Sequence, residues 1–430
     1  MRRIWLVILG DSLAFWLSFF AMIIIRFNDS FSRMALREHL FPFLILYATW
    51  ILCFYLFGLY DIVNIKPTIP HAKRFISAFA MCLAVGMLFF YLVPIFGIAP
   101  KTNLFLEVLG FGIFSFLLRR AVYSLFSRQI TREVALAGKT PYLEELRRMI
   151  EENPQLGLKI TCFSSDLHEA LRNFSAKRDM VFIFEETSEE IPRKDMVSLY
   201  SNKAEIIDVA EAYERYFYKI PVSYISQRWI VENLSARKNA AYAFFSRIID
   251  IIFASLIFVI SSPFWLLGAL AVYFYDRGPI FYTHDRVGLY GKPFRLYKLR
   301  SMVTDAEKNG AVWAGEHDPR ITPPGRILRK LHVDEIPQMI NVLRGDLSMV
   351  GPRPERPEFV RELEEKIPYY DLRHVIRPGF TGWAQIKFRY ARSEMDAKDK
   401  FEYDLYYLKN RNIFLDFGII LRTVQIIFTH

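Results

Sequence analysis

The sequence predicts a membrane protein with an N-terminal bundle of transmembrane α-helices, an α/β Rossmann-like middle domain, and an α-rich monotopic C-terminal domain that begins with a kinked, re-entrant helix. Hydrophobic residues make up 53% of the 430 residues, more than a soluble protein usually contains. Four long apolar segments lie in the first 130 residues, and a fifth, interrupted by proline, follows a strand–helix alternation. The predicted ranges are 1–130 for the bundle, 131–220 for the middle domain, 221–246 for a linker, 247–277 for the re-entrant helix and 278–430 for the rest of the C-terminal domain.

The four N-terminal apolar segments mostly approach the roughly 20 residues that cross a bilayer core. They run approximately over Ile4–Phe27, Leu40–Tyr60, Phe75–Gly97 and Leu104–Leu118. The strongest cluster of basic residues follows the fourth segment: Arg119, Arg120, Arg128 and Arg132. By the positive-inside rule this cluster places the middle domain in the cytoplasm, and an even number of spans puts the N-terminus there too. Arg26, Arg33 and Arg37 in the first loop argue mildly against this orientation.

The formal net charge of +10 suits nucleic acid, an anionic membrane face or phosphorylated substrates. Because the chain contains apolar spans, we do not expect nucleic acid as a partner. The three cysteines, Cys53, Cys82 and Cys162, lie too far apart for a disulfide framework or a zinc-binding spacing. We expect them to be buried as small hydrophobic residues.

The middle domain shows the pattern of a parallel α/β sheet. "REVALAGKT" reads as a strand and a turn, "PYLEELRRMIEENP" as an amphipathic helix, and "MVFIF" and "AEIIDV" as buried strands. A dinucleotide-binding unit has G-x-G-x-x-G after its first strand, but here only Gly138 is present and Pro141 follows. We therefore expect a structural or regulatory role for this domain and no bound cofactor.

The fifth apolar segment contains Ser261, Ser262 and Pro263 near its middle. Proline removes one helical hydrogen bond and clashes with the preceding turn, and serine hydroxyls can satisfy the freed carbonyl groups. Such a kink can return the chain to the side of the membrane from which it entered. The helix chemistry alone leaves a re-entrant turn and a complete crossing about equally supported.

Basic residues become dense after Gly278 and alternate with Gly and Pro. The three richest segments are "GPIFYTHDRVGLYGKPFRLYKLRSM", "RGDLSMVGPRPERPEF" and "RPGFTGWAQIKFRY". Gly-Pro and Pro-Gly steps fix loops, and basic side chains on rigid loops suit phosphate binding. A solvated positive surface is the alternative, but it does not require so many fixed turns.

The segment "LHVDEIPQMINVLRG" places two acids at the predicted start of a helix. Its apolar residues follow helical spacing, at Ile336, Met339, Ile340 and Leu343. Pro337 fits the first helical turn, so Asp334 and Glu335 would lie at the positive end of the helix dipole, which favours anions. One acid could act as a nucleophile while the other holds a metal or orients the site. A purely stabilising N-cap is the alternative.

Six ordered motifs between Ala243 and the end of the chain resemble the bacterial sugar transferase family, the monotopic polyprenyl-phosphate phosphoglycosyl transferases. They are the kinked helix with Ser262 and Pro263, "GPIFYTHDRVG", "YKLRSM", "HVDEIPQMINVLRGDLSMVGPRPE", "RPGFTGWAQI" and "EYDLYYLKN". By architecture, the N-terminal spans and the Rossmann-like unit resemble the long form of the family, which includes undecaprenyl-phosphate galactose and glucose phosphotransferases.

The resemblance implies transfer of a sugar-1-phosphate from a UDP-sugar to undecaprenyl phosphate, which starts polysaccharide, O-antigen or capsule repeat-unit synthesis. Asp334 is the implied nucleophile: it attacks the β-phosphate, UMP leaves, and the lipid phosphate then attacks the aspartyl-phosphosugar intermediate. Glu335 is its implied dyad partner. The implied location is the bacterial inner membrane with the catalytic domain on its cytoplasmic face. Because nucleotide sugars are cytoplasmic, this chemistry favours the re-entrant helix.

The resemblance also implies a magnesium ion, with Asp334, Glu335 and Asp404 as candidate ligands. The implied phosphate-binding residues are Arg286, Lys298, Arg300 and Arg353. The long form also makes a homodimer an expectation. His284 stands where the family frequently has glutamine, and Lys387 and Phe388 replace a more usual Asn and Gly, which bears on the sugar or nucleotide accepted.

Other classes of function are less well supported by the residues. A catalytically inactive membrane scaffold or regulator of polysaccharide assembly would not need the intact Asp334–Glu335 dyad and "GPRP" motif. A transporter would not need the basic C-terminal half, and a NAD-dependent enzyme would need the missing glycine fingerprint. The C-terminal run "NIFLDFGIILRTVQIIF" is interrupted by polar residues, so we expect an interfacial helix rather than a span.

Overall fold

The computed structural model describes residues 2–27, 33–60, 68–93, 100–128, 132–166, 169–171, 180–185, 193–201, 204–234, 240–306, 318–388 and 394–428. The chain divides into two compact units, Met1–Ala212 and Tyr213–His430. Each unit has its own hydrophobic clusters, and each is described by itself below.

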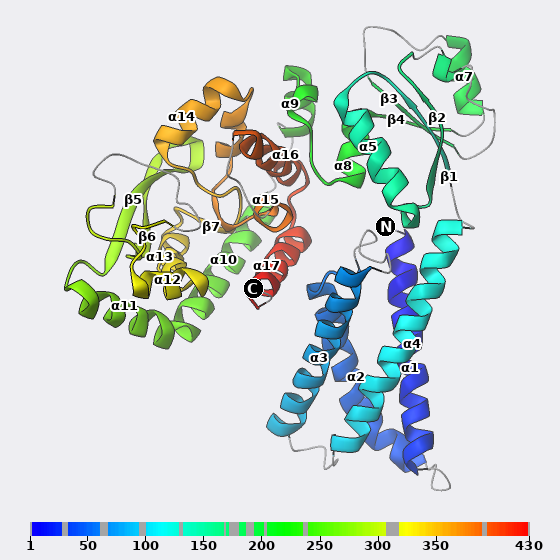
Figure 1. Ribbon diagram of the computed structural model, residues 1–430, viewed down its shortest axis with the longest axis horizontal. Coiled ribbons are helices and arrows are strands. Elements are labelled where there is room, and N and C mark those ends of the chain that lie inside the picture. Colours follow the sequence, from blue (N-terminus) through cyan, green and yellow to red (C-terminus); the bar gives the residue numbers. More distant parts are fainter. Residues whose placement is uncertain are drawn as a thin grey trace. The chain divides into compact units, whose positions relative to one another are not determined.

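Four long helices form the N-terminal bundle and run alongside one another in Figure 1. They are α1 (Arg2–Phe27), α2 (Arg33–Leu56), α3 (Ile69–Leu92) and α4 (Pro100–Arg128). Aromatic side chains fill the bundle: Trp50 and Phe54 both stack on Phe111 of α4, with ring centroids 5.7 and 5.2 Å away. Many apolar side chains point outward instead, as a lipid-facing surface requires.

Three of the four predicted N-terminal spans are confirmed as helices long and apolar enough to cross a membrane, at Trp5–Phe27, Leu36–Leu56 and His71–Leu92. The fourth such helix among the described residues is Ala240–Ile260, and α4 is not in this set. Helix α4 contains the predicted segment Leu104–Leu118 but also buries charge. Arg119 pairs with Asp11 of α1 and donates to the carbonyl oxygen of Leu59 at 2.7 Å.

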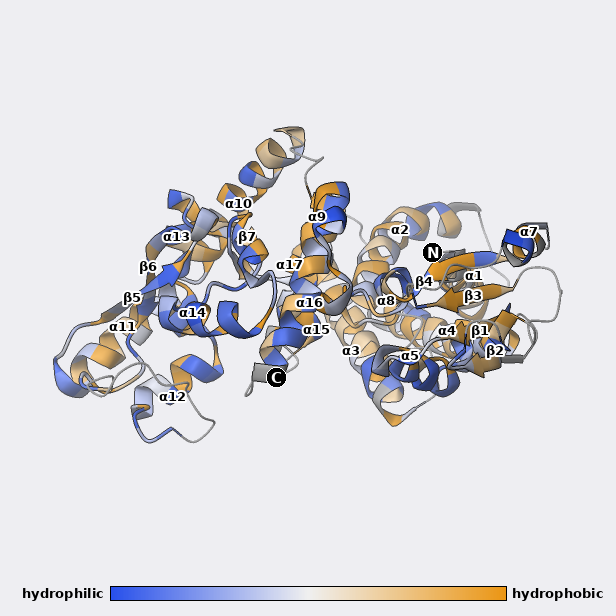
Figure 2. Cartoon of the chain, turned by 90° about the horizontal axis from the view of Figure 1, so that it is seen from above, coloured by the Kyte–Doolittle hydropathy of each residue, from blue (hydrophilic) through white to orange (hydrophobic). Residues whose placement is uncertain are grey.

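The middle domain is the α/β region that the sequence predicts. Its elements are β1 (Arg132–Ala137), α5 (Pro141–Glu152), η4 (Pro154–Leu156), β2 (Leu158–Ser164), β3 (Val181–Phe184), α7 (Arg193–Ser201), β4 (Glu205–Asp208) and α8 (Val209–Tyr216). The strands form one parallel sheet in the order β2-β1-β3-β4, which confirms the predicted parallel sheet. Figure 2 shows the central strands β1 and β3 as hydrophobic and α7 as hydrophilic. Strand β2 was not predicted.

The second unit combines helices with two small sheets. Its first elements are η5 (Val222–Tyr224), α9 (Gln227–Leu234), α10 (Ala240–Ile260), α11 (Ser262–Asp276), β5 (Phe281–Val287), η6 (Leu289–Gly291), β6 (Pro293–Leu299), α12 (Pro323–Lys330), η7 (Val333–Glu335) and α13 (Gln338–Arg344). The remaining elements are β7 (Ser348–Val350), α14 (Pro357–Lys366), η8 (Tyr370–His374), β8 (Gly379–Thr381), α15 (Trp383–Lys387), α16 (Glu394–Asn410) and α17 (Ile413–Phe428). Strands β5 and β6 pair antiparallel, and β7 and β8 pair parallel.

The first described part of the predicted linker, residues 221–234, packs against α16. Val222 donates its backbone N–H to the carboxylate of Glu402 at 3.1 Å, and Ile220 donates to the carbonyl oxygen of the same residue at 2.9 Å. Apolar side chains around Ile225 join a cluster with Phe401 of α16. This segment therefore belongs structurally to the second unit, and α10 begins at Ala240.

The fifth apolar segment breaks at the predicted Ser-Pro site into α10 and α11. Ser261, between the helices, has φ −82° and ψ 0°, outside the helical range. Pro263 has no N–H for the carbonyl oxygen of Val259, four residues earlier, and the Ser262 hydroxyl donates to that oxygen instead at 2.7 Å. The predicted break and the predicted use of serine hydroxyls are both present.

Both ends of the α10–α11 segment are attached to other elements of the second unit. Arg247 of α10 donates to the carbonyl oxygens of Val342 and Leu343 at the end of α13, at 2.6 and 2.7 Å. At the other end, Asp276 of α11 pairs with Arg300, just after β6. Helix α11 also packs closely on α12, because a Cβ atom on Gly268 would meet a methyl group of Leu328 at 2.7 Å.

The predicted interfacial helix is α17, which packs against β7 and β8. Ile419 and Ile420 are buried, and Phe414 is exposed. The carboxylate of Asp416 is buried and accepts hydrogen bonds from the hydroxyls of Tyr407 and Tyr242 at 2.7 and 2.8 Å. One face of α17 thus belongs to the core of the unit, and its placement at a membrane surface stays a prediction.

Candidate functional site

One pocket of the second unit has a volume of about 510 Å³, within the usual range of small-molecule sites. It lies beside the β5–β6 hairpin and η7. Residues on its wall that bear on chemistry are Tyr282, His284, Arg286, Lys298, Arg300, Asp334, Glu335, Glu355, Arg356 and Phe359. Aromatic rings, several cations and two adjacent carboxylates therefore meet in one place.

The Asp334–Glu335 dyad lies on η7, a single turn of 3₁₀ helix, and not in the first turn of an α-helix as predicted. His332, directly before this turn, has φ +53°, a left-handed conformation. Helix α13 begins only at Gln338, so Pro337 caps it from outside. The predicted buried face of α13 is only partly correct, as the exposures of its apolar side chains show.

Met339 is buried, whereas Leu343 is exposed and Ile336 and Ile340 are half-buried. Gln338, Asn341 and Val342 complete the buried set of α13. The Asn341 side chain explains why a polar residue is buried there. It donates to the carbonyl oxygen of Arg295 at 2.7 Å and accepts from the backbone N–H of Tyr297 at 3.1 Å, which fixes α13 to β6.

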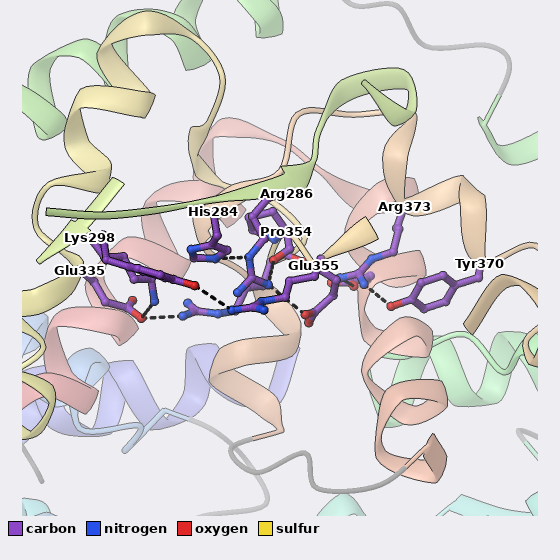
Figure 3. Close-up of polar contacts among 12 residues, drawn as sticks. His284, Arg286, Lys298, Glu335, Pro354, Glu355, Tyr370 and Arg373 are labelled. Carbon is purple, nitrogen blue, oxygen red and sulfur yellow. Dashed lines mark hydrogen bonds and ion pairs between the residues drawn. The ribbon is translucent and has the colours of Figure 1, made fainter. Parts of the chain in front are cut away.

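Glu335 is held between two cations from distant parts of the chain. Its Oε1 accepts from Lys298 Nζ at 2.8 Å and from Arg353 Nη2 at 2.7 Å; Figure 3 shows Lys298 facing Glu335. Burial alone would raise the pKa of Glu335, but Arg353 and Lys298 outweigh it and hold this pKa well below its ordinary value. Glu335 is therefore ionised, and it anchors two of the predicted phosphate-binding residues.

Asp334 differs from its neighbour because no cation of the described residues forms an ion pair with it. The residue is 6% exposed, and its Oδ1 is buried without a hydrogen-bond partner among the described residues. Burial, followed by the charge of Glu335, raises the pKa of Asp334 above its ordinary value. A carboxylate with a raised pKa and a free oxygen is more basic than usual, which suits a nucleophile.

Arg286 lies in the pocket wall, but its guanidinium is engaged by the protein. Its Nε donates to His284 Nε2 at 2.6 Å and its Nη1 donates to the carbonyl oxygen of Pro354 at 2.9 Å. Nη1 also pairs with Glu355 at 3.3 Å. Burial lowers the pKa of Arg286 to about 10. The structure therefore brings Arg286 to the "GPRP" loop.

Arg300 reaches the pocket wall, but its guanidinium forms a two-pronged ion pair with Asp276 at the end of α11. The side chain is buried, and Gly278 leaves room for it: a Cβ atom there would meet Arg300 Nη1 at 2.6 Å. In the structure, Arg300 connects the end of β6 to α11.

Asp404 does not line the pocket that contains the dyad. It is buried on α16, where its Oδ2 accepts from Arg373 Nη2 at 3.1 Å. Burial raises the pKa of Asp404 to about 6, against the opposing effect of Arg373. Among the described residues, no group of three or more His, Cys, Asp or Glu side chains is placed to hold a metal ion, so Asp334, Glu335 and Asp404 do not converge as the predicted set of ligands.

Sequence reasoning missed several residues that shape the site. Glu355 and Arg356, directly after the "GPRP" motif, line the pocket, and Arg356 donates to the Tyr282 hydroxyl at 3.2 Å. Arg373 donates to the carbonyl oxygen of Arg353 at 2.9 Å. The density of arginine around the Pro-Gly turns was the available signal, but the sequence does not reveal which arginine faces the pocket.

Known proteins resemble this chain over its C-terminal part. Residues 241–430 match the bacterial sugar transferase family. The UDP-N-acetylgalactosamine-undecaprenyl-phosphate N-acetylgalactosaminephosphotransferase of Aeromonas hydrophila is 38% identical over 242 residues, which cover 52% of this chain and 57% of that protein. The UDP-glucose:undecaprenyl-phosphate glucose-1-phosphate transferase of Klebsiella pneumoniae is 32% identical over 315 residues, 68% of this chain and 67% of the relative.

A third relative, the undecaprenyl-phosphate galactose phosphotransferase of Salmonella typhimurium, is 34% identical over 218 residues, 46% of this chain and 43% of that protein. The chain thus spans between about two fifths and two thirds of the length of these three relatives. The matched residues 241–430 coincide with the region in which the six motifs lie. The resemblance drawn from those motifs is confirmed: the chain belongs to the bacterial sugar transferase family.

Proposed function

We propose that this protein transfers a sugar-1-phosphate from a UDP-sugar to undecaprenyl phosphate through a covalent intermediate on Asp334. The observation that carries the proposal is the contrast within the dyad. Asp334 offers a buried carboxylate oxygen with no hydrogen-bond partner among the described residues, while Glu335 holds Lys298 and Arg353 beside it. A nucleophile next to two fixed cations is the arrangement that attack on an anionic diphosphate needs.

In the first half-reaction, Asp334 Oδ1 attacks the β-phosphorus of the UDP-sugar. The bond from that phosphorus to the bridging oxygen breaks, and UMP leaves with the electron pair. Lys298 and Arg353 lie within reach of the dyad and would stabilise the charge on the transferring phosphoryl group. The rings of Tyr282 and Phe359 in the same pocket provide an apolar wall for the nucleobase.

In the second half-reaction, a phosphate oxygen of undecaprenyl phosphate attacks the same phosphorus. The phosphorus–Asp334 bond breaks, the carboxylate is regenerated, and the product is undecaprenyl diphosphate sugar. The acceptor is a lipid, so the pocket must open next to the membrane. Helices α11 and α12, which pack together beside this pocket, carry exposed apolar side chains such as Leu267, Phe274 and Ile327.

The residues of the pocket fit a magnesium ion that is shared with the substrate. Magnesium in phosphoryl-transfer enzymes is commonly held by one or two carboxylates together with substrate phosphates. The Asp334 carboxylate is buried with Oδ1 unpartnered among the described residues, whereas Oε1 of Glu335 is engaged by two cations. With Oδ1 making the attack, the second Asp334 oxygen and the diphosphate oxygens would hold the ion, which when bound neutralises part of the diphosphate charge. Asp404 has no place in this site.

We place the catalytic unit on the cytoplasmic face of the bacterial inner membrane, with α10 and α11 as a re-entrant hairpin. A straight helix from Arg247 to Asp276 would be about 43 Å long at 1.5 Å per residue, enough to separate its ends across the bilayer. Yet these two residues bind α13 and Arg300 of the same unit. Attachment of both ends to one domain supports a turn within the membrane. The homodimer stays a prediction.

The proposed activity predicts that membranes containing this protein release UMP from at least one UDP-sugar. Release should continue beyond one turnover only when undecaprenyl phosphate is supplied. The assay would compare UDP-N-acetylgalactosamine, UDP-glucose and UDP-galactose, because the named relatives act on different sugars. Radiolabel from the sugar should move into the lipid fraction. If no UDP-sugar yields UMP or labelled lipid, the protein would be an inactive scaffold and the proposal would fail.

The proposed hairpin can be tested by cysteine labelling. The variant carries a single cysteine at the exposed Lys292, and Cys53, Cys82 and Cys162 are replaced by serine. A membrane-impermeant thiol reagent should react only after the inner membrane is opened. Substitution P263A restores the helical N–H and removes a clash worth about 3 kcal/mol, so a measurable fraction should become reactive in intact spheroplasts and activity should fall several-fold.

The matched control for P263A is P293A, at the exposed first residue of β6, which should leave both labelling and activity unchanged. Labelling of Lys292→Cys in intact spheroplasts without any proline substitution would place the catalytic unit outside the cytoplasm. Unchanged labelling in P263A would show that the attachments of Arg247 and Asp276 hold the hairpin without help from proline.

A further inference from the structure

The loop that follows β7 presents Arg353 to Glu335, and two other arginines hold the backbone of this loop. We propose that Arg286 and Arg373 form a clamp on the consecutive carbonyl groups of Arg353 and Pro354, and that Asp404 and His284 orient the two arms of the clamp. The inference rests on the proposed transferase function. It assigns Arg286 and Asp404 as positioning residues, in place of the substrate-binding and metal-binding roles predicted from the motifs.

The first arm of the clamp is Arg373. Its Nη2 donates to the carbonyl oxygen of Arg353 at 2.9 Å and to Asp404 Oδ2 at 3.1 Å. A third bond joins its Nη1 to the Tyr370 hydroxyl, and Figure 3 shows these two side chains facing each other. Arg373 and Asp404 are both buried. Because a guanidinium stays ionised inside a protein, the buried carboxylate balances its charge and fixes its direction.

The second arm is Arg286, which donates to the next carbonyl oxygen along the chain, that of Pro354, at 2.9 Å. Its Nε donates to His284 Nε2 at 2.6 Å, as Figure 3 also shows. A guanidinium has only donors, so His284 Nε2 must accept, and the imidazole must be neutral. Burial, together with Arg286 and nearby cations, lowers the pKa of His284 to about 2, which keeps it neutral at every relevant pH.

The loop that the two arms hold is also constrained by close backbone packing at Gly351, just before Arg353. Gly351 donates its N–H to the carbonyl oxygen of Thr381 at 2.9 Å, and a Cβ atom on Gly351 would meet the carbonyl oxygen of Arg377 at 2.5 Å. With the carbonyl groups of Arg353 and Pro354 also held, the Arg353 backbone has little freedom. Its side chain is then directed to Glu335 Oε1, 2.7 Å away, before any substrate binds. Such preorganisation lowers the reorganisation needed in the transition state.

The test measures kcat and KM for the UDP-sugar in the full-length protein carrying R373K or D404N, each with and without R353K. Positioning partners typically contribute about 10-fold to 100-fold to activity. In the otherwise unaltered protein, D404N and R373K should lower kcat by about that factor, with a much smaller change in KM. In the R353K background, D404N or R373K should lower kcat by a further factor of less than about 2, because the clamp acts through Arg353.

Magnesium dependence separates positioning from metal binding. D404N should leave the magnesium concentration for half-maximal activity unchanged, whereas loss of a metal ligand would raise it at least about 10-fold. The matched control is R361K, at an exposed arginine of α14, which should change none of these quantities. The clamp would be overturned if the losses of kcat caused by D404N and R353K multiplied in full in the double variant. It would also be overturned if D404N raised the magnesium requirement.

The second arm keeps the proposal testable if D404N does not fold. H284Q retains an acceptor for Arg286 Nε and should keep most of the activity, whereas H284L removes the acceptor and should lower kcat about 10-fold. Equal activity of H284Q and H284L would overturn this arm. All variants are compared with UMP release by the unaltered protein, so absence of that release would count against the proposed function and not against the clamp.

Discussion

Replacing Asp334 with asparagine should reduce UMP release at least about 10⁴-fold, the scale seen when an enzyme loses its nucleophile. The amide is almost the same size as the carboxylate but cannot form the acyl-phosphate bond. Asp334 Oδ1 has no hydrogen-bond partner among the described residues, so the substitution breaks few existing contacts at that atom. Burial and the charge of Glu335 already disfavour the ionised form, so a neutral side chain should not destabilise the fold.

The measurement is a single turnover with UDP-sugar labelled in the β-phosphate and no lipid acceptor. The unaltered protein should retain label after denaturation and release one equivalent of UMP, while D334N should do neither. D371N, at an exposed aspartate of η8 in the same unit, is the control and should behave as the unaltered protein does. Retained label in D334N would assign the nucleophile to another group.

The sequence predicted the neighbourhood of the dyad better than its local structure. Pro337 and the spacing of Ile336, Met339 and Ile340 indicated a helix start, and α13 does begin directly after Pro337, at Gln338. The left-handed conformation of His332 and the 3₁₀ turn on which the acids lie depend on how η7 packs against α11, α12 and β6. Such packing contacts override local periodicity and are not visible in it.

Pairing partners were the part of the site that sequence reasoning could not supply. Lys298 and Glu335 are 37 positions apart, and they meet because β6 lies next to η7. Short strands such as β7 and β8, with three residues each, leave too little pattern to predict their pairing. Asp404 shows the consequence: an acid in a recognisable motif suggested a metal ligand, whereas the fold places Arg373 against it.

The membrane-associated segments were more predictable, because length and apolar composition decide them. The Ser-Pro break between α10 and α11 follows from local chemistry alone, and the structure reproduces even the exchange of a backbone donor for the Ser262 hydroxyl. Helix α4 was harder, since its buried charge at Arg119 is acceptable only with Asp11 of α1 opposite it. In the middle domain, β2 escaped prediction because this edge strand is only partly buried and its pairing shifts register opposite Val134 and Ala135.

Replacing Glu335 with glutamine should lower kcat by about 10²-fold to 10³-fold, and the cause is electrostatic. Glu335 is the shared acceptor of Lys298 and Arg353, and an amide leaves these two cations close together without a counter-charge. Removing the shared partner of these partly buried ion pairs also destabilises the fold, so the melting temperature in detergent should fall as well. E335D keeps the charge on a shorter side chain and should retain more of both activity and stability.

The pH dependence of E335Q tests the coupling within the dyad. Asp334 must be ionised to attack, so the first half-reaction should slow as the pH falls through its raised pKa. Burial is the larger cause of this raised pKa and the charge of Glu335 the second, so removing that charge should lower the pKa of Asp334 without restoring its ordinary value. The acid limb of the UMP-release profile should therefore move to lower pH in E335Q while its plateau is reduced, and it should stay in place in E335D. An acid limb that does not move in E335Q would mean that a group other than Asp334 controls the reaction at low pH.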